Sequence, residues 1–441
     1  MRVGPHLPGY RFVTREAIAI GVIALLLSFP ADVRAYSVLA HEAIIDAAWD
    51  TKIRPLLLQR FPRSTPEELR RAHGFAYGGA IIQDLGYYPH GSHFFSDLTH
   101  YIRSGDFIQA LLRDSQDVNE YAFALGALSH YVSDDDGHRL AVNRAVPLLY
   151  PYLERKYGNV ITYEENPAVH LKTEFGFDVL QVAKERYAPD SYHDFIGYEV
   201  AKPLLERAFQ DTYSLPLQLV FDDLDRAIGS YRYAAHSAIP KATKVAWALK
   251  KDEIKRDVPG MTRKKFLYNL SRASYEKKWG RDYRKPGLGA KFLAFLIRIL
   301  PKIGPLQVLT FRTPTPETEN MFMASFNATL EDYKRLLDEE RNGHLKLPNN
   351  NLDTGSVTPP GNYFMTDETY ARLLDGLAKD HFKLISMEVR GDILDYYQDS
   401  KAPIATKKNR KEWARVTQEL EELKSAAPSR PLASSDSGPA K

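Results

Sequence analysis

The sequence predicts an all-α protein, built as a bundle of many helices. After Tyr36, apolar residues recur at spacings of three and four, which is the period of an amphipathic helix, whereas the alternating pattern of strands is rare. The 441 residues are 44% hydrophobic and 26% charged, so the chain is long enough to bury a large core and to form two domains. We therefore expect a helical bundle followed by an additional helical C-terminal domain.

Residues 1–35 have the pattern of a secretory signal peptide. Arginines precede an apolar run over residues 17–29, and Val33-Arg34-Ala35 provides small residues for cleavage before Tyr36. The run is shorter than the roughly 20 residues with which a helix crosses a bilayer. We therefore expect a secreted or periplasmic protein that begins at Tyr36, with an uncleaved N-terminal anchor as the alternative.

Several helices are expected in order along the first domain, residues 36–239. Ser37 can cap the first helix, and a second helix carries Ala72, Ala76 and Ala80, whose small side chains permit close packing against a neighbour. The remaining helices of this domain are expected over residues 117–134, from Asn166-Pro167 through Glu174, over 199–213 and over 217–236.

Beyond Pro240 the sequence becomes more basic and is interrupted more often by proline, so a domain boundary is expected there. The second domain, residues 240–425, should contain helices over 316–340 and 367–398 with a long loop over 348–363. Residues 287–311 mix apolar side chains with cations, for which a buried helix is favoured over a helix in a membrane interface. Residues 426–441 should form a disordered tail.

The composition limits the chemistry that is open to the chain. Cysteine is absent, which excludes disulfides, thiolate metal sites and a cysteine nucleophile. The net charge of +3 arises from 59 basic and 56 acidic residues, a balance that argues against a broadly basic surface for nucleic acid. A bound metal would therefore need histidine and carboxylate ligands.

Candidate metal ligands are concentrated in the first domain. His130 and Asp134 are four residues apart on a predicted helix, so their side chains share one face, and His170 and Glu174 repeat this spacing. One such pair is usually a surface ion pair, but His130 lies in an apolar stretch where an unpaired imidazole would be costly to bury. The full set exceeds the needs of one zinc ion and comprises His41, Asp84, His100, His130, Asp134, His138, His170 and Glu174.

In this order, the residues resemble the zinc-dependent phospholipase C family, which shares its fold and trinuclear zinc site with the S1/P1 nucleases. The resemblance covers about residues 36–235 and begins with an aromatic residue, Tyr36, whose free amine and carbonyl would bind zinc. It implies three Zn²⁺ ions. One would be held by Asp84, His100, His130 and Asp134, its close partner by His138, His170 and Glu174, and the third by Tyr36 and His41 with Asp134 bridging. Asp84 would also be the catalytic general base.

The chain departs from the family pattern in three places. Tyr36 stands where the family usually has tryptophan. Only three residues separate Asp134 from His138, so Asp135 could replace Asp134 as the ligand or the second zinc could be displaced. Residues 240–425 have no counterpart in the small phospholipases, and their role is not predicted.

The resemblance implies a secreted zinc-dependent phosphodiesterase. The leading interpretation is a phospholipase C that hydrolyses glycerophospholipids by attack of a zinc-bound hydroxide on phosphorus, with phospholipid and a peripheral membrane surface as its partners. One alternative is a single-strand nuclease of the S1/P1 type, for which nucleic acid would be the substrate. A second alternative is a non-catalytic, zinc-containing, membrane-associated binding protein. The headgroup preference and the oligomeric state are not predicted.

Overall fold

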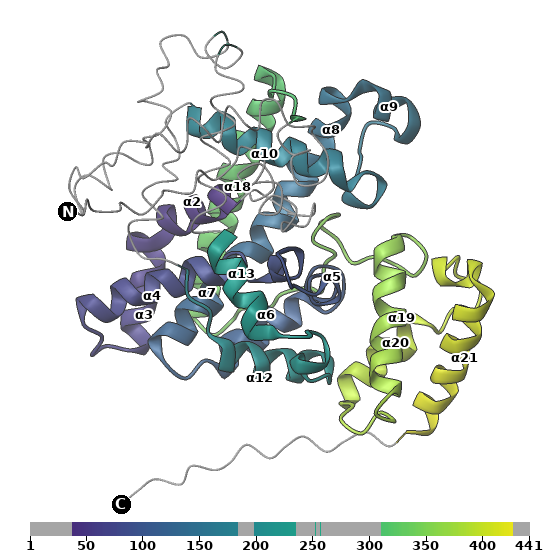
Figure 1. Cartoon of the computed structure of the whole chain (residues 1–441). Helices are drawn as coiled ribbons and strands as arrows, with labels where there is room; N and C mark the ends of the chain where they lie inside the picture. Colours follow the sequence, from purple (N-terminus) through teal and green to yellow (C-terminus); the bar gives the residue numbers. More distant parts are fainter. Residues whose placement is uncertain (1–37, 184–197, 235–251, 253–255, 257–309, 427–441) are drawn as a thin grey trace, which may run out of the picture.

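The computed structural model describes residues 38–183, 198–234, 252, 256 and 310–426 (Figure 1). Within these residues the regular structure is helical and no strand is formed; a single bridge there joins Asn351 and Ser356. The all-α prediction is therefore confirmed for this part of the chain. The predicted signal peptide, Tyr36, Ser37, the segment 287–309 and all but the first residue of the predicted tail lie outside the described residues.

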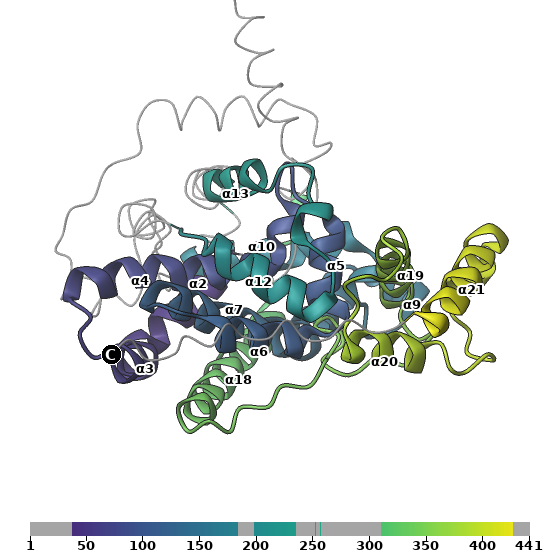
Figure 2. The ribbon, with the colours of Figure 1, turned by 90° about the horizontal axis from the view of Figure 1, so that it is seen from below.

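Helix α7 (Val118–Gly137) lies at the centre of the bundle. The side chain of Asp117 begins it by accepting the backbone N–H groups of Asn119 and Glu120 at 2.8 and 2.9 Å. The expected helix over 117–134 is thus present and continues to Gly137. Around α7 pack the helices α2 (Val38–Ala48), α3 (Arg54–Arg60), α4 (Pro66–Gly79), α6 (Ser104–Asp114) and α18 (Pro316–Arg341) (Figure 2).

Helices α4 and α7 cross at very short range because glycine stands at the contact. A Cβ atom on Gly126 would lie 2.1 Å from the carbonyl oxygen of Ala76, and one on Gly79 would lie 2.0 Å from that of Phe123. Ala72 and Ala76 are fully buried, as the small-residue pattern predicted. The crossing brings the end of α4 and the 3₁₀ helix η2 (Ile82–Tyr87), which carries Asp84, against the middle of α7.

The other elements of the first part complete the layer around α7. Asp223 caps α13 by accepting the N–H of Arg226 at 2.9 Å, so this helix begins at Leu224 rather than near 217 as expected. The expected helices from 167 and over 199–213 are present as α10 and α12. These elements are η1 (Trp49–Ile53), α5 (His93–Tyr101), η3 (His138–Val142), α8 (Asn143–Leu149), α9 (Pro151–Tyr157), η4 (Tyr163–Glu165), α10 (Pro167–Ala183), α12 (Lys202–Tyr213), η5 (Leu217–Leu219) and α13 (Leu224–Tyr233).

Helix α18 matches the helix expected over 316–340 and packs into the first part of the bundle. The ring of Phe322 stacks on Phe177 with centroids 4.7 Å apart, and the hydroxyl of Tyr333 donates to the carbonyl of Leu125 at 2.8 Å. The boundary near residue 240 stays a prediction. Residues from 316 onward nevertheless share one buried core with the first part.

The expected helix over 367–398 is two helices, α19 (Phe364–Ala378) and α20 (Met387–Tyr396). His381 and Phe382 between them take positive φ angles of 51° and 56°, which no α-helix accommodates, and Ser386 then caps α20. The last elements are η8 (Ala405–Lys408) and α21 (Arg410–Ser425), and α19 packs against both α21 and α5. Among the described helices, none combines the length and the apolar character of a membrane span.

The close crossing of α4 and α7 gives a test of the packing. Gly126→Ala should lower the free energy of unfolding by about 1–3 kcal/mol, because the new methyl group must push α4 away. Gly229→Ala, also within a helix but with nothing within 4 Å of its Cβ, should leave stability unchanged or raise it by up to about 1 kcal/mol. Urea denaturation measures both, and equal stability of the two variants would refute the close contact.

Candidate metal centre

The structure brings together all the candidate ligands that it describes, from helices that are distant in sequence. Tyr36 lies outside the described residues. The side chains form three groups, the first two of which share His130; in each group every residue offers one ligand atom and these atoms lie within 4.8 Å of one another. The groups are His41, His130 and Asp134; Asp84, His100 and His130; and His138, His170 and Glu174.

Six elements supply these eight residues, and each side chain is buried. Successive turns of one helical run, α7 followed by η3, carry three of them at intervals of four residues. The contributions are His41 from α2, Asp84 from η2, His100 from α5, His130 and Asp134 from α7, His138 from η3, and His170 and Glu174 from α10.

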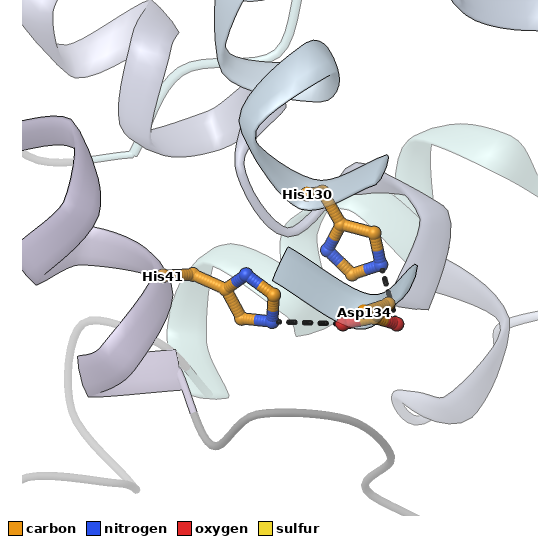
Figure 3. Close-up of side chains that lie close together, drawn as sticks. All are labelled: His41, His130 and Asp134. Atoms are coloured by element: carbon orange, nitrogen blue, oxygen red, sulfur yellow. Dashed lines mark ion pairs between the residues drawn. The ribbon is translucent and has the colours of Figure 1, made fainter. Parts of the chain in front are cut away.

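Asp134 belongs to the first group, and its carboxylate also lies close to His100 of the second. Its Oδ1 lies 3.5 Å from Nε2 of His41, and its Oδ2 lies 3.2 Å from Nε2 of His130 (Figure 3) and 3.3 Å from Nε2 of His100. Asp135 instead accepts a hydrogen bond from the Asn350 amide at 2.8 Å. The geometry therefore favours Asp134 over Asp135 as the ligand.

The rings of His100 and His130 are oriented by backbone carbonyls. Nδ1 of His130 lies 3.0 Å from the oxygen of Ala80, and Nδ1 of His100 lies 2.7 Å from that of Ser96. A carbonyl only accepts, so each Nδ1 carries the hydrogen and each Nε2 presents a lone pair to the cluster. This is the arrangement that holds metal-binding histidines in register.

The third group forms despite the short spacing between Asp134 and His138. Nδ1 of His170 lies 2.7 Å from Oε1 of Glu174, and Nε2 of His138 lies 3.9 Å from the same oxygen. The spacing works because the α-helical turn continues to His138, whose backbone N–H donates to the carbonyl of Asp134, so that His138 stays on the face of Asp134. The departure from the family pattern therefore does not move His138 away from the other ligands.

Two residues near the third group were not predicted from the sequence. Asn143 Oδ1 lies 2.7 Å from Nε2 of His170, and Asp353 Oδ1 lies 2.7 Å from Nδ1 of His138. In the π-helix η3 the backbone N–H of Asn143 donates to the carbonyl of His138, five residues earlier, and a pattern of four-residue intervals does not detect this pairing. Asp353 comes from the loop expected over 348–363, and its sequence carries no signal of the contact.

The charges of the cluster depend strongly on one another. The neighbouring imidazoles of His130 and His100 hold the pKa of Asp134 well below its usual range even though burial opposes this. Burial lowers the pKa of His100 and of His138, but their carboxylate partners outweigh it and raise each to about 9. For His100 these partners are Asp134 and Asp84. The site thus favours positive charge close to its carboxylates.

The donor set fits a divalent metal. Both carboxylate oxygens of Asp134, Oδ1 of Asp84 and Nε2 of His138 are buried without a hydrogen bond. The Nε2 atoms of His100 and His130 face each other at 3.2 Å, where two lone pairs would repel. A cation bound among these atoms would satisfy them together, and zinc accepts nitrogen and oxygen ligands without cysteine.

Comparison with known protein families gives a match over part of the chain. Residues 40–222 match the family model described as zinc dependent phospholipase C. The matched span contains every candidate ligand from His41 to Glu174 and ends well before Asp353. No curated protein and no solved structure matches the chain.

The grouping predicts that one histidine is decisive for metal binding. His130→Ala should lower zinc affinity on the order of 100-fold or more, because His130 belongs to two groups and losing a direct ligand costs more than losing a supporting residue. His344→Ala, at an exposed position after α18, should bind zinc as the wild type does. Competition with a chromophoric chelator measures both, and equal affinities would remove His130 from the ligand set.

The raised pKa values predict a pH dependence of zinc binding. His100 and His138, with pKa values of about 9, must lose a proton to bind a metal through Nε2. Apparent zinc affinity should therefore rise from about pH 6 to about pH 9, with proton release on binding that diminishes toward the upper end. Titration calorimetry in buffers of different ionisation enthalpy measures this release. Its absence at neutral pH would contradict ligation by these histidines.

Proposed function

We propose that the chain hydrolyses glycerophospholipids at the centre described above, because residues 40–222 match the family model of zinc dependent phospholipase C. The family is one of phosphoric diester hydrolases. The observation that carries the proposal is the convergence of eight buried histidine and carboxylate side chains, all within the matched residues. The number of zinc ions, three, is part of the proposal, with Tyr36 and His41 at the third.

The proposed reaction is the addition of water to phosphorus. The bond between phosphorus and the glycerol oxygen breaks, and the products are diacylglycerol and a phosphorylated headgroup. Zinc, if bound at this centre by the candidate ligands, would supply Lewis acidity and water of lowered pKa. The protein supplies fixed ligands that need no rearrangement, because Asp134, His100 and His130 already lie within 3.5 Å of one another.

Asp84 is proposed to accept the proton of the attacking water. Its Oδ1 is buried without a hydrogen bond and lies 3.5 Å from Nε2 of His100. Burial raises the pKa of Asp84, which brings it closer to the range in which a carboxylate is an effective general base. The same residue would also touch the metal, so both roles depend on its position in η2.

Exposed apolar side chains near the centre favour a phospholipid over a nucleic acid. Val357 and Phe364 are 63% and 55% exposed and follow Asp353 in the chain by four and eleven residues. The backbone N–H of Phe364 donates to Glu164 at 2.7 Å, six residues before His170. Apolar side chains in this position suit contact with a lipid surface, whereas a nuclease would be expected to present cations there.

We also propose that the protein is secreted or periplasmic and begins at Tyr36. The pattern of residues 1–35 supports this, and so does the chemistry of a free α-amine at Tyr36, five residues before His41. Cleavage before Tyr36 would produce this amine, which no internal residue can offer.

The experiment is a set of assays on the protein purified after export, with its N-terminus sequenced. Phosphatidylcholine vesicles should yield diacylglycerol, chelation should abolish the activity, and added Zn²⁺ should restore it. His130→Ala should be inactive and His344→Ala fully active. Tyr36 should be the first residue.

Two results would overturn the proposal. Cleavage of single-stranded DNA without turnover of any phospholipid would assign the site to a nuclease. A full complement of zinc without hydrolysis of any phosphodiester would indicate a non-catalytic binding protein. A first residue other than Tyr36 would remove only the third zinc and its amine ligand.

A further inference from the structure

A carboxylate from the far end of the chain is buried beside the third group of candidate ligands. Asp353 is 2% exposed, and its Oδ1 lies 2.7 Å from Nδ1 of His138 across 215 residues of sequence. The residue lies outside the span that matches the zinc-dependent phospholipase C family. Because an isolated carboxylate is costly to bury, we expect the buried Asp353 to have a specific role.

We propose that Asp353 is a positioning residue of the zinc centre, which accepts the Nδ1 hydrogen of His138 and thereby directs Nε2 to the metal. Nε2 of His138 is buried and makes no hydrogen bond in the protein. A carboxylate at Nδ1 fixes the tautomer that leaves Nε2 basic and also makes the ring a stronger ligand. The inference rests on the zinc centre proposed above, but not on the identity of the substrate.

Comparison with the other histidines shows why His138 needs an external partner. His100 and His130 are oriented by backbone carbonyls of the matched domain, at 2.7 and 3.0 Å. His138 lies at the start of the π-helix η3, and its Nδ1 contacts Asp353 instead. A part of the chain outside the matched span therefore performs at His138 the task that backbone carbonyls within the span perform at the other two rings.

Asp353 is itself held in one orientation. Its Oδ2 accepts the hydroxyl of Tyr363 at 2.6 Å and the backbone N–H of Tyr163 at 2.8 Å, while its backbone carbonyl accepts the amide of Asn143 at 2.7 Å. These bonds leave Oδ1 directed at His138. The carboxylate is thus preorganised before any metal binds.

The segment before Asp353 is fastened to the residues of the first two groups. The backbone N–H of Leu352 donates to the carbonyl of His100 at 2.9 Å. The hydroxyl of Tyr131 donates to the carbonyl of Pro348 at 2.8 Å. Each of these bonds joins the segment to a candidate ligand or to the residue beside one. The position of Asp353 is therefore fixed relative to the first two groups as well as to the third.

The test measures zinc binding to the full-length protein directly. Asp353→Ala should weaken one zinc of the complement by about 10–100-fold, the range for loss of a supporting partner of a ligand, and leave the others unchanged. Asp353→Asn, which keeps the shape but loses the charge, should weaken the same zinc by a smaller factor. Metal analysis after dialysis against graded chelator gives the affinities, and the visible spectrum of the Co²⁺-loaded protein reports a change in ligand field at that one site.

The matched control is Asn349→Ala. Asn349 fastens the same segment through its contacts with the backbone N–H and the carboxylate of Asp106, at 2.9 and 3.1 Å, but touches none of the candidate ligands. It should bind zinc as the wild type does, with an unchanged Co²⁺ spectrum. Circular dichroism and thermal melting identify any variant that fails to fold.

Three results would overturn the inference. They are wild-type zinc affinity in Asp353→Ala, equal weakening of every zinc in that variant, and an equal loss in Asn349→Ala. Failure of the proposed function looks different, because zinc binding would then respond to Asp353 while the loaded wild type hydrolysed no phosphodiester.

Discussion

The structure depends on the burial of carboxylates and imidazoles at one place in a helical core. Asp84, Asp134 and Glu174 are at most 3% exposed, and the histidines around them are buried as well. Removing such groups from water costs several kcal/mol for each ion unless opposite charge and hydrogen bonds replace the water. Several of their atoms make no hydrogen bond, so hydrogen bonds within the described residues do not meet this cost in full. A divalent cation bound at the centre, as proposed above, would satisfy these atoms together.

The helices supply the rigidity that this requires. The run of α7 and η3 sets His130, Asp134 and His138 along one face, and the glycine contacts between α4 and α7 bring Asp84 close to them. Backbone carbonyls then fix the rings of His100 and His130. Positions set in this way change little when a ligand binds, which is what catalysis by preorganised charge needs.

Much of this could be predicted from the sequence because it depends on local spacing. The helical period identified α7, α10 and α18, and the four-residue intervals placed His130 with Asp134 and His170 with Glu174. The spacing could not predict backbone turns and contacts that depend on tertiary structure. The break between α19 and α20 depends on two residues with positive φ, and the role of Asn143 depends on a π-turn that shifts the register by one residue. The contact of Asp353 with His138 joins two distant parts of the chain, and no local pattern encodes it.

The contact between Asp353 and His138 joins the second half of the chain to the candidate metal centre. The sequence predicts a separate helical domain there, yet α18 packs on α7, and the loop after α18 reaches the candidate ligands.

The most direct test of the account is anomalous diffraction at the zinc edge from crystals of the mature protein. It should show zinc between Asp84, His100, His130 and Asp134, and a second zinc at Nε2 of His138 beside Glu174. Zinc found only at the protein surface, or side chains at this place that hold no metal in zinc-saturated crystals, would contradict the account.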